Sequence, residues 1–137
     1  MQFLGDRYGV ERGLWPAAGT PERLAALSWT TWSYVTFNAS LRLLYLATSD
    51  STPEALHDEA IVALARKGIA ADLAVLDGVL ATKKFILGDA YSLADLIVGS
   101  VVLFARSIGA PIDEHPHVKA WADVVAARPA MRAAWKP

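Results

Sequence analysis

The stretch Ser92-Leu93-Ala94-Asp95 decides the fold, because it opens the most apolar segment of the sequence. A serine followed three residues later by a carboxylate has the spacing of a helix capping box, in which each side chain accepts a hydrogen bond from the backbone N–H of the other residue. Tyr91 before the cap and Leu96 after it have the spacing of a hydrophobic staple. We therefore predict that a helix begins at Leu93 and is fixed by Tyr91, Ser92, Asp95 and Leu96.

The helix that follows the cap is apolar almost all the way round and is expected to run to about Ile108, before Gly109 and Pro111. It is too short to span a membrane, which takes about 20 residues, and a helix of this kind lies at the centre of a domain. A carboxylate at Asp95 then needs hydrogen-bond partners. The cap supplies them, and the alternative role for Asp95 is that of a catalytic acid.

Start signals elsewhere in the sequence predict the other helices. Thr20-Pro21-Glu22 predicts a long helix to about Ala47, and Thr52-Pro53-Glu54 predicts a second one to about Lys84. Shorter helices are expected from Pro116 to about Ala127 and over 130–135. The apolar stripe of the first long helix is Leu24, Leu27, Thr31, Val35, Leu41 and Tyr45. That of the second is Leu56, Ile61, Leu64, Ile69, Leu73, Leu76 and Leu80.

No segment alternates with the period of a strand, so the fold class is all-α. We expect an orthogonal bundle of about five helices, with two long helices, a buried central helix and two shorter ones. The glycine-rich residues 1–19 are expected to be a linker, in which Phe3 and Leu4 are the tail of an earlier helix. Residues 20–137 are expected to form one helical domain.

The composition bounds the function. With 54% hydrophobic residues the chain can build a core, and a net charge of −1 gives no basic surface for nucleic acid. The absence of cysteine excludes a thiol nucleophile and fits a reducing compartment. The N-terminus has no secretory signal, so we expect a cytoplasmic protein that is not embedded in a membrane.

The segment from Phe85 to Leu96 resembles the signature of the C-terminal domain of glutathione transferases. Its sequence FILGDAYSLADL contains an apolar pair, a Gly-Asp turn, and then the cap and staple of a central helix. Other stretches resemble the same family in order along the chain. These are Asp6-Arg7-Tyr8-Gly9, Leu14-Trp15-Pro16, Glu22-Arg23, Trp29-Thr30-Thr31-Trp32, Pro116-His117-Val118-Lys119-Ala120-Trp121 and Ala127-Arg128-Pro129-Ala130.

The resemblance implies the helical domain of a glutathione transferase without the thioredoxin-like domain that holds and activates glutathione in that family. Residues 1–19 resemble the interdomain link. The helical domain would contribute the wall for a hydrophobic co-substrate and part of a dimer contact. Glutathione would be a co-substrate only if the missing domain is supplied, so activity of the isolated chain is not expected. The alternative is a non-enzymatic module for protein binding or assembly, either as a homodimer or with a separate thioredoxin-like domain.

Within that resemblance, Thr31, Tyr34 and Asn38 share a helical face that corresponds to the co-substrate wall. Phe104 and Trp135 are further candidates for the same pocket. The alternative for all five residues is ordinary packing, or exposure left by the missing domain. In the same way, Trp29 and Trp32 are either core anchors or part of a hydrophobic docking face.

Histidines offer a weak metal hypothesis. His115 and His117 lie near Asp113 and Glu114, but no cysteine accompanies them, and we interpret them as solvated loop residues with no metal site. His57, next to Asp58 and Glu59, is interpreted as part of an exposed helix face. No residue is predicted to be catalytic.

Overall fold

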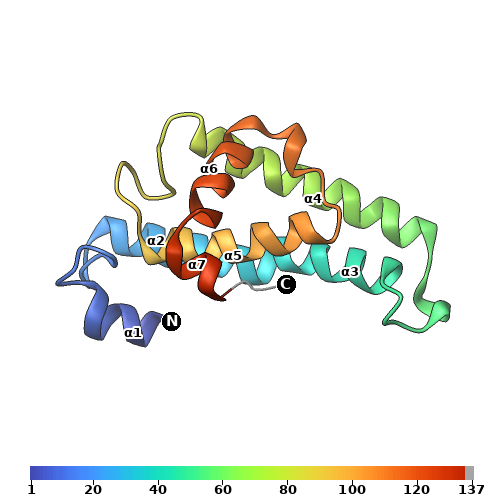
Figure 1. The fold of residues 1–137 in the computed structure, drawn as a ribbon, viewed down its shortest axis with the longest axis horizontal. Helices are drawn as coiled ribbons and strands as arrows, with labels where there is room; N and C mark the ends of the chain where they lie inside the picture. The colour runs from blue at the N-terminus through green and yellow to red at the C-terminus, as the bar shows by residue number, and fades with distance from the viewer. Residues whose placement is uncertain (135–137) are drawn as a thin grey trace.

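The computed structural model describes residues 1–134, and its regular elements are helical throughout that range. The prediction of an all-α fold is confirmed, and Figure 1 shows the arrangement. In chain order the helices are α1 (Gln2–Leu4), α2 (Pro21–Trp32), α3 (Asn38–Thr48), α4 (Glu59–Leu80), α5 (Leu93–Ser107), α6 (Pro116–Ala126) and α7 (Pro129–Ala134). Shorter helical turns are η1 (Gly5–Gly9), η2 (Ser33–Phe37), η3 (Glu54–Leu56) and η4 (Ile112–Glu114).

The first long helix begins where the sequence predicts, with the Thr20 hydroxyl accepting from the Arg23 N–H at 3.2 Å. It then contains the π-helical turn η2. The predicted apolar stripe is wrong at Leu24 and Val35, which are 68% and 67% exposed. The buried face is formed instead by Ala26, Thr30, Ser33, Phe37, Leu41, Leu44 and Ala47.

The start predicted for the second long helix is also wrong, because α4 begins at Glu59 and is capped by Asp58. Thr52 closes the preceding turn: its hydroxyl donates toward the carbonyl oxygens of Leu46, at 2.9 Å, and Ser49, at 2.7 Å. Because the Thr52 hydroxyl caps the end of α3, it does not cap the next helix, which begins at a later residue. The helix ends at Leu80, so Lys83 and Lys84 lie beyond it.

Helices α3 and α4 lie side by side and run in opposite directions, joined by residues 49–58 at one end of the molecule (Figure 1). The inner face of α4 carries Ile69, Leu73 and Leu76, which are fully buried. The predicted stripe is wrong at Leu56, in η3, and at Ile61 and Leu64, in the N-terminal turns of α4, since these side chains are 45%, 36% and 63% exposed. The core is thus built on the C-terminal two-thirds of α4.

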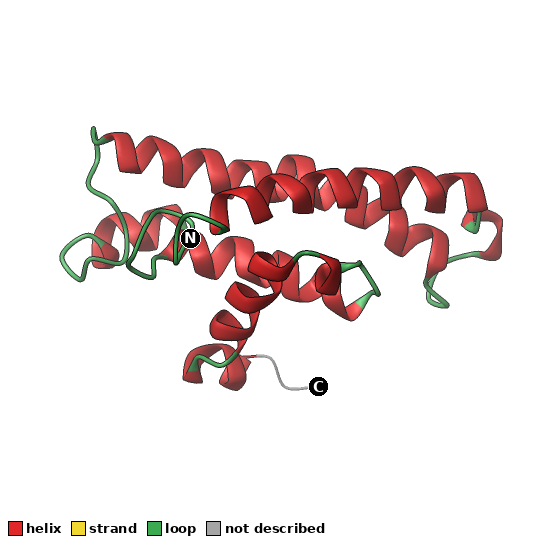
Figure 2. Cartoon of the chain, turned by 90° about the horizontal axis from the view of Figure 1, so that it is seen from above, coloured by secondary structure: helices red, strands yellow, loops and turns green. Residues whose placement is uncertain are grey.

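Helix α5 runs through the centre of the bundle and packs against both α2 and α6. Helix α6 crosses the long helices steeply (Figure 2), and the crossing agrees with the orthogonal arrangement predicted. The helix start at Leu93 and the end near Ile108 are as predicted. Among the described residues, no helix combines the length and the apolar character that crossing a membrane requires.

Candidate functional site

A hollow of about 500 Å³ lies between the N-terminal residues, α2 with η2, and α5. Small-molecule sites in proteins measure about 300–1,000 Å³, so this one is large enough for a ligand. We call it the N-terminal hollow. Its lining residues are Met1, Gln2, Phe3, Thr30, Thr31, Tyr34, Val35 and Ile97.

The N-terminal wall of this hollow is held in place by Arg23 on α2. One Arg23 nitrogen, Nη1, lies 2.6 Å from the Asp6 carboxylate and donates to the Pro16 carbonyl at 3.1 Å. Its guanidinium also lies over the buried Trp15 ring, 4.9 Å from the ring centroid. The hydrogen bond from Arg23 is the main cause that lowers the pKa of Asp6. These contacts fix α1 and η1 against the bundle.

Gly5 allows this packing, because the ring of Trp15 approaches its backbone closely. A Cβ at that position would lie 2.8 Å from two carbon atoms of the ring. In addition, the Leu14 carbonyl accepts from the Leu93 N–H at 2.8 Å, which ties the same segment to the start of α5. The N-terminal segment therefore packs as part of the domain.

Two of the five residues proposed for a co-substrate wall line the N-terminal hollow. Thr31 and Tyr34 both face it from α2 and η2, and Tyr34 is 57% exposed. Asn38 is half-buried one turn later and is not among the lining residues. Phe104 is half-buried and packs near the Tyr45 ring, with centroids 6.2 Å apart. Trp135 lies outside the described residues.

The chemistry of the N-terminal hollow is that of a binding surface. Phe3 and Val35, each 67% exposed, supply apolar area, and the polar side chains are the hydroxyls of Thr31 and Tyr34 with the amide of Gln2. Such groups hydrogen-bond the polar substituents of an apolar molecule.

The two tryptophans of α2 pack inward. Trp29 and Trp32 meet edge to face with centroids 5.2 Å apart, and Trp32 stacks on Phe37 at 5.5 Å. Both indoles are half-buried against the main core. This geometry agrees with the interpretation as core anchors.

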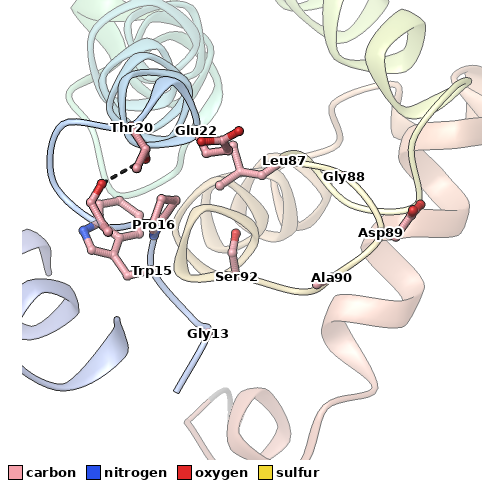
Figure 3. Close-up of a pocket in the computed structure, with 11 residues that line it drawn as sticks. Gly13, Trp15, Pro16, Thr20, Glu22, Leu87, Gly88, Asp89, Ala90 and Ser92 are labelled. Carbon is pink, nitrogen blue, oxygen red and sulfur yellow. Dashed lines mark hydrogen bonds between the residues drawn. The ribbon is translucent and has the colours of Figure 1, made fainter. Parts of the chain in front are cut away.

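A second hollow, of about 370 Å³, lies between residues 13–22 and residues 87–92 (Figure 3). The Thr20 hydroxyl donates to the Ala17 carbonyl at 2.9 Å on one side, and the chain of residues 87–92 passes on the other. The ionisable residues that line it are Glu22 and Asp89. Of the residues predicted from sequence, this hollow contains only Ser92.

Asp95 is fully buried and accepts four hydrogen bonds. Its Oδ2 accepts from the Ser92 N–H at 2.9 Å and from the Ser92 hydroxyl at 2.8 Å. The Ser92 oxygen in turn accepts from the Ala94 N–H at 3.2 Å, which completes a capping box. The other oxygen, Oδ1, accepts from the Ile86 N–H at 2.8 Å and the Trp121 indole N–H at 3.0 Å.

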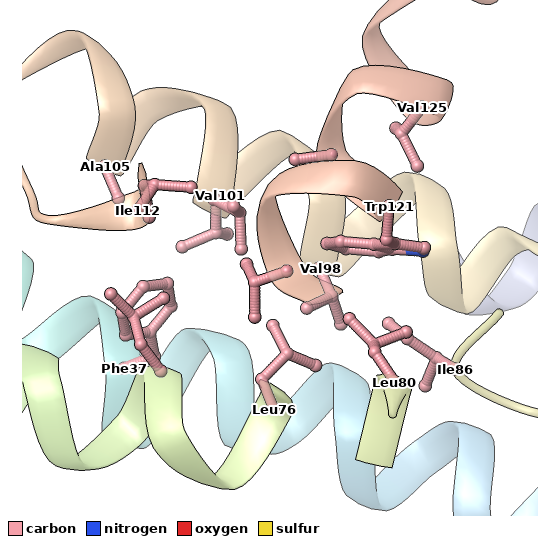
Figure 4. Packing of buried hydrophobic residues seen from close by; sticks show 14 of the residues in the cluster. Phe37, Leu76, Leu80, Ile86, Val98, Val101, Ala105, Ile112, Trp121 and Val125 are labelled. Carbon is pink, nitrogen blue, oxygen red and sulfur yellow. The ribbon is translucent and has the colours of Figure 1, made fainter. Parts of the chain in front are cut away.

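The bonds to Ile86 and Trp121 show that Asp95 connects three parts of the bundle: the turn before α5, α5 itself and α6. The side chains of Ile86 and Trp121 both lie in the buried core (Figure 4). A carboxylate enclosed in this way cannot touch a substrate, so its role is structural. Tyr91 and Leu96 are both half-buried. The Tyr91 ring meets Phe85 edge to face at 5.7 Å and carries the Arg128 guanidinium 3.5 Å above it. The Tyr91–Leu96 staple stays a prediction.

His117 is exposed, as expected for a solvated residue, but it lies on a helix rather than in a loop and has a side-chain partner. It stands in the first turn of α6, where its Nδ1 lies 2.9 Å from Asp77 Oδ2. The other Asp77 oxygen accepts from the N–H groups of His117, at 2.8 Å, and Val118, at 2.9 Å. Burial raises the pKa of Asp77, but these hydrogen bonds outweigh burial and lower it. Within residues 1–134 no three His, Asp or Glu side chains gather as metal ligands.

His57 likewise has local partners, its Nε2 lying 3.1 Å from the Thr52 hydroxyl. Sequence reasoning missed Asp77 and Trp121, because their partners lie 40 and 26 residues away. No local pattern signals such a contact.

Comparison with known proteins identifies relatives over nearly the whole chain. The family description "Glutathione S-transferase, C-terminal domain" matches residues 31–129. The glutathione S-transferase GstB of Escherichia coli strain K12 is 27% identical over 133 residues, which are 96% of this chain and 62% of that protein. The chain thus spans about three-fifths of the length of the curated relatives it matches.

Solved structures agree with this result. A glutathione transferase from Methylococcus capsulatus strain Bath has a TM-score of 0.79 and 26% identity, covering 97% of this chain and 62% of that one. The theta class glutathione S-transferase of Xanthomonas axonopodis pv. citri, solved with glutathione bound, has a TM-score of 0.78 and 30% identity. That match covers 96% of this chain and 67% of the other.

Proposed function

The chain belongs to the glutathione S-transferase family through its C-terminal domain, and from that premise we propose that it acts as the helical part of a glutathione transferase. In this role it binds the hydrophobic co-substrate, and a thioredoxin-like domain holds and activates glutathione. The observation that carries the proposal is the N-terminal hollow, where exposed apolar side chains meet two hydroxyls.

The position of this hollow supports the proposal. One of its walls is made of residues 1–3, which belong to the segment that resembles the interdomain link of the family. Arg23 and Trp15 hold that segment against the bundle. A thioredoxin-like domain attached through it is therefore brought next to the hollow, and the glutathione thiolate is brought next to a bound electrophile.

The side chains of the hollow indicate which steps this domain supports and which steps require the thioredoxin-like domain. Phe3 and Val35 remove the apolar body of the electrophile from water, which is worth about 25 cal/mol per Å² of buried surface. Tyr34 and Thr31 orient its polar substituents by hydrogen bonds. Holding two reactants in this geometry accelerates their reaction by raising their effective concentration. We expect no conjugation by these residues alone, because the thiol must be deprotonated by the thioredoxin-like domain.

A contact between two copies of the chain forms part of the same proposal. Ile61, Leu64 and Val75 recur along one flank of α4 and are 36%, 63% and 55% exposed. Asp72 lies in the same row, and burial raises the pKa of its carboxyl group. An exposed apolar row of this kind usually marks a contact with another protein. We place this dimer in the cytoplasm, where a chain without cysteine needs no oxidising environment.

The test joins this chain to the thioredoxin-like domain of the Xanthomonas theta class relative and measures conjugation of glutathione to chlorodinitrobenzene. The chain alone is expected to show no turnover, and the joined protein is expected to show it. Tyr34→Ala should raise the KM for the electrophile several-fold and leave the KM for glutathione unchanged, because Tyr34 lines only the electrophile wall. Val124→Ala, which alters a 51% exposed side chain on α6 outside both the hollow and the proposed dimer contact, is the matched control.

Turnover by the chain alone would contradict the assignment of thiol activation to the other domain. A folded joined protein without turnover would favour the alternative, in which the helical domain is a non-enzymatic assembly module. Equal effects of Tyr34→Ala and Val124→Ala on the electrophile KM would show that the N-terminal hollow is not the co-substrate wall.

A further inference from the structure

A separate hollow of about 310 Å³ lies at the C-terminal end of α5, where that helix meets α6 and α7. We call it the arginine hollow. It shares no residue with the N-terminal hollow. Its lining residues are Leu103, Arg106, Ser107, Ala126, Met131 and Arg132.

Arg106 is only partly satisfied by the protein. Its Nη1 donates to Asp123 Oδ1 at 2.9 Å, and this bond lowers the pKa of Asp123 more than any other contact. The other two guanidinium nitrogens, Nε and Nη2, are buried and have no hydrogen-bond partner among the described residues. A charged donor that loses water without gaining a partner is destabilising, and most buried donors in folded proteins are paired.

These two unpaired nitrogens lie along one edge of the guanidinium group, opposite the nitrogen used by Asp123. The Nε and Nη2 hydrogens of that edge point in parallel and match the two oxygens of a carboxylate. The Arg106 side chain lines the hollow, so its guanidinium group lies at the wall. The unpaired Nε and Nη2 edge is therefore the group with which a carboxylate entering the hollow would pair.

The rest of the arginine hollow suits an apolar body. Leu103 and Met131 supply a hydrocarbon and thioether surface, and Met131 is only 6% exposed. Arg132 adds a second positive charge, which forms no ion pair within residues 1–134. Asp123 cannot neutralise the site alone, because it is shared between Arg106 and Lys119.

We propose that the arginine hollow binds a small organic acid, with its carboxylate on Nε and Nη2 of Arg106 and its apolar body against Leu103 and Met131. Electrostatic attraction from Arg132 adds to the affinity. The site is separate from the co-substrate site proposed above, since the two hollows share no lining residue, although α5 contributes to both. Its ligand is therefore a molecule other than the electrophile that takes part in conjugation.

The test titrates the chain with hydrocinnamate, an apolar aromatic carboxylate, and with its uncharged amide as the matched ligand. Calorimetry is expected to give a Kd on the order of 1 mM for the acid, a usual affinity for a ligand of this size. The amide should bind at least about tenfold more weakly, because it offers no second anionic oxygen. Backbone amide signals of Leu103, Ser107 and Met131 should shift in NMR spectra during the titration.

Arg106→Lys keeps the charge and can still pair with Asp123, but it removes the bidentate edge, so hydrocinnamate should bind at least about tenfold more weakly. Arg42→Lys, an exposed change on α3, should have no effect. If Arg106→Lys fails to fold, the proposal is tested by Arg132→Gln, which should weaken hydrocinnamate binding, and by whether the shifted NMR signals lie at the arginine hollow. Equal binding of acid and amide, unchanged affinity in the folded Arg106 variant, shifts confined to other helices, or no saturation by about 10 mM would overturn the proposal.

Discussion

Replacement of Asp95 by alanine is expected to be far more destabilising than the loss of an ordinary helix cap. The change leaves the N–H groups of Ile86, Ser92 and Trp121 buried without an acceptor. Each unsatisfied buried donor costs about 1–3 kcal/mol. Water entering the vacated space and the relief of a buried charge offset part of that sum. We therefore expect a loss of about 4 kcal/mol, against a total of about 5–15 kcal/mol for a typical domain.

Asp58→Ala is the matched control, because it removes a carboxylate from a helix cap that is exposed. Asp58 accepts from the N–H groups of Ala60 at 2.7 Å and Ile61 at 3.4 Å. Its loss should cost about 1 kcal/mol, the usual value for a cap. Both variants are compared with the parent chain by urea unfolding followed by tryptophan fluorescence and circular dichroism. A loss for Asp95→Ala no larger than that for Asp58→Ala would refute the reasoning.

Three further predictions concern packing, pH and assembly. Gly99→Ala should lower the free energy of unfolding in urea by about 1–3 kcal/mol, because the added Cβ would lie 2.8 Å from Val125. Gly78→Ala should raise the free energy of unfolding by about 0.5–1 kcal/mol, because no atom lies within 4 Å of the added Cβ. Hydrogen bonds lower the pKa of Asp77 below its ordinary value of 3.8. The ionised carboxylate therefore stabilises the fold at a pH above 3.8, and this contribution is lost as the pH falls through the lowered pKa. The difference in stability between the parent chain and Asp77→Asn should therefore shrink in acid. Leu64→Lys should convert a dimer to a monomer in sedimentation, and an unchanged mass would place the interface elsewhere.

The central helix could be predicted from the sequence because its signals are local. Ser92 and Asp95 are three residues apart, and the cap, the apolar run and the helix end all lie in one continuous segment of sequence. Backbone geometry alone then fixes where the helix starts. The family resemblance drew on the same residues, and it is confirmed by the family match over residues 31–129.

The second long helix shows where such local reasoning fails. Thr20-Pro21-Glu22 and Thr52-Pro53-Glu54 are identical in sequence, yet only the first opens an α-helix. Thr20 accepts from the Arg23 N–H, whereas the Thr52 hydroxyl is taken up by the end of α3. Which role a hydroxyl takes depends on the turn that precedes it. The buried face of the first long helix was also mispredicted, because it includes Thr30 and Ser33, two polar residues that an apolar stripe does not identify.

The candidate site was predictable in part. Thr31 and Tyr34 share a face one turn apart, and both line the N-terminal hollow. Phe3 and Ile97 complete it from segments distant in sequence, so periodicity could not identify them. Asn38 lies one turn beyond Tyr34 but is half-buried and does not line the hollow.

The central claim is that the N-terminal hollow binds the hydrophobic co-substrate. It is tested most directly by an NMR titration of this chain with dinitrobenzene, an unreactive relative of the electrophile. The account predicts that the amide signals that shift will cluster at Phe3, Thr31, Tyr34 and Ile97, and that Tyr34→Ala will weaken binding. Shifts that cluster on another face of the bundle, or saturable binding that Tyr34→Ala leaves unchanged, would contradict it.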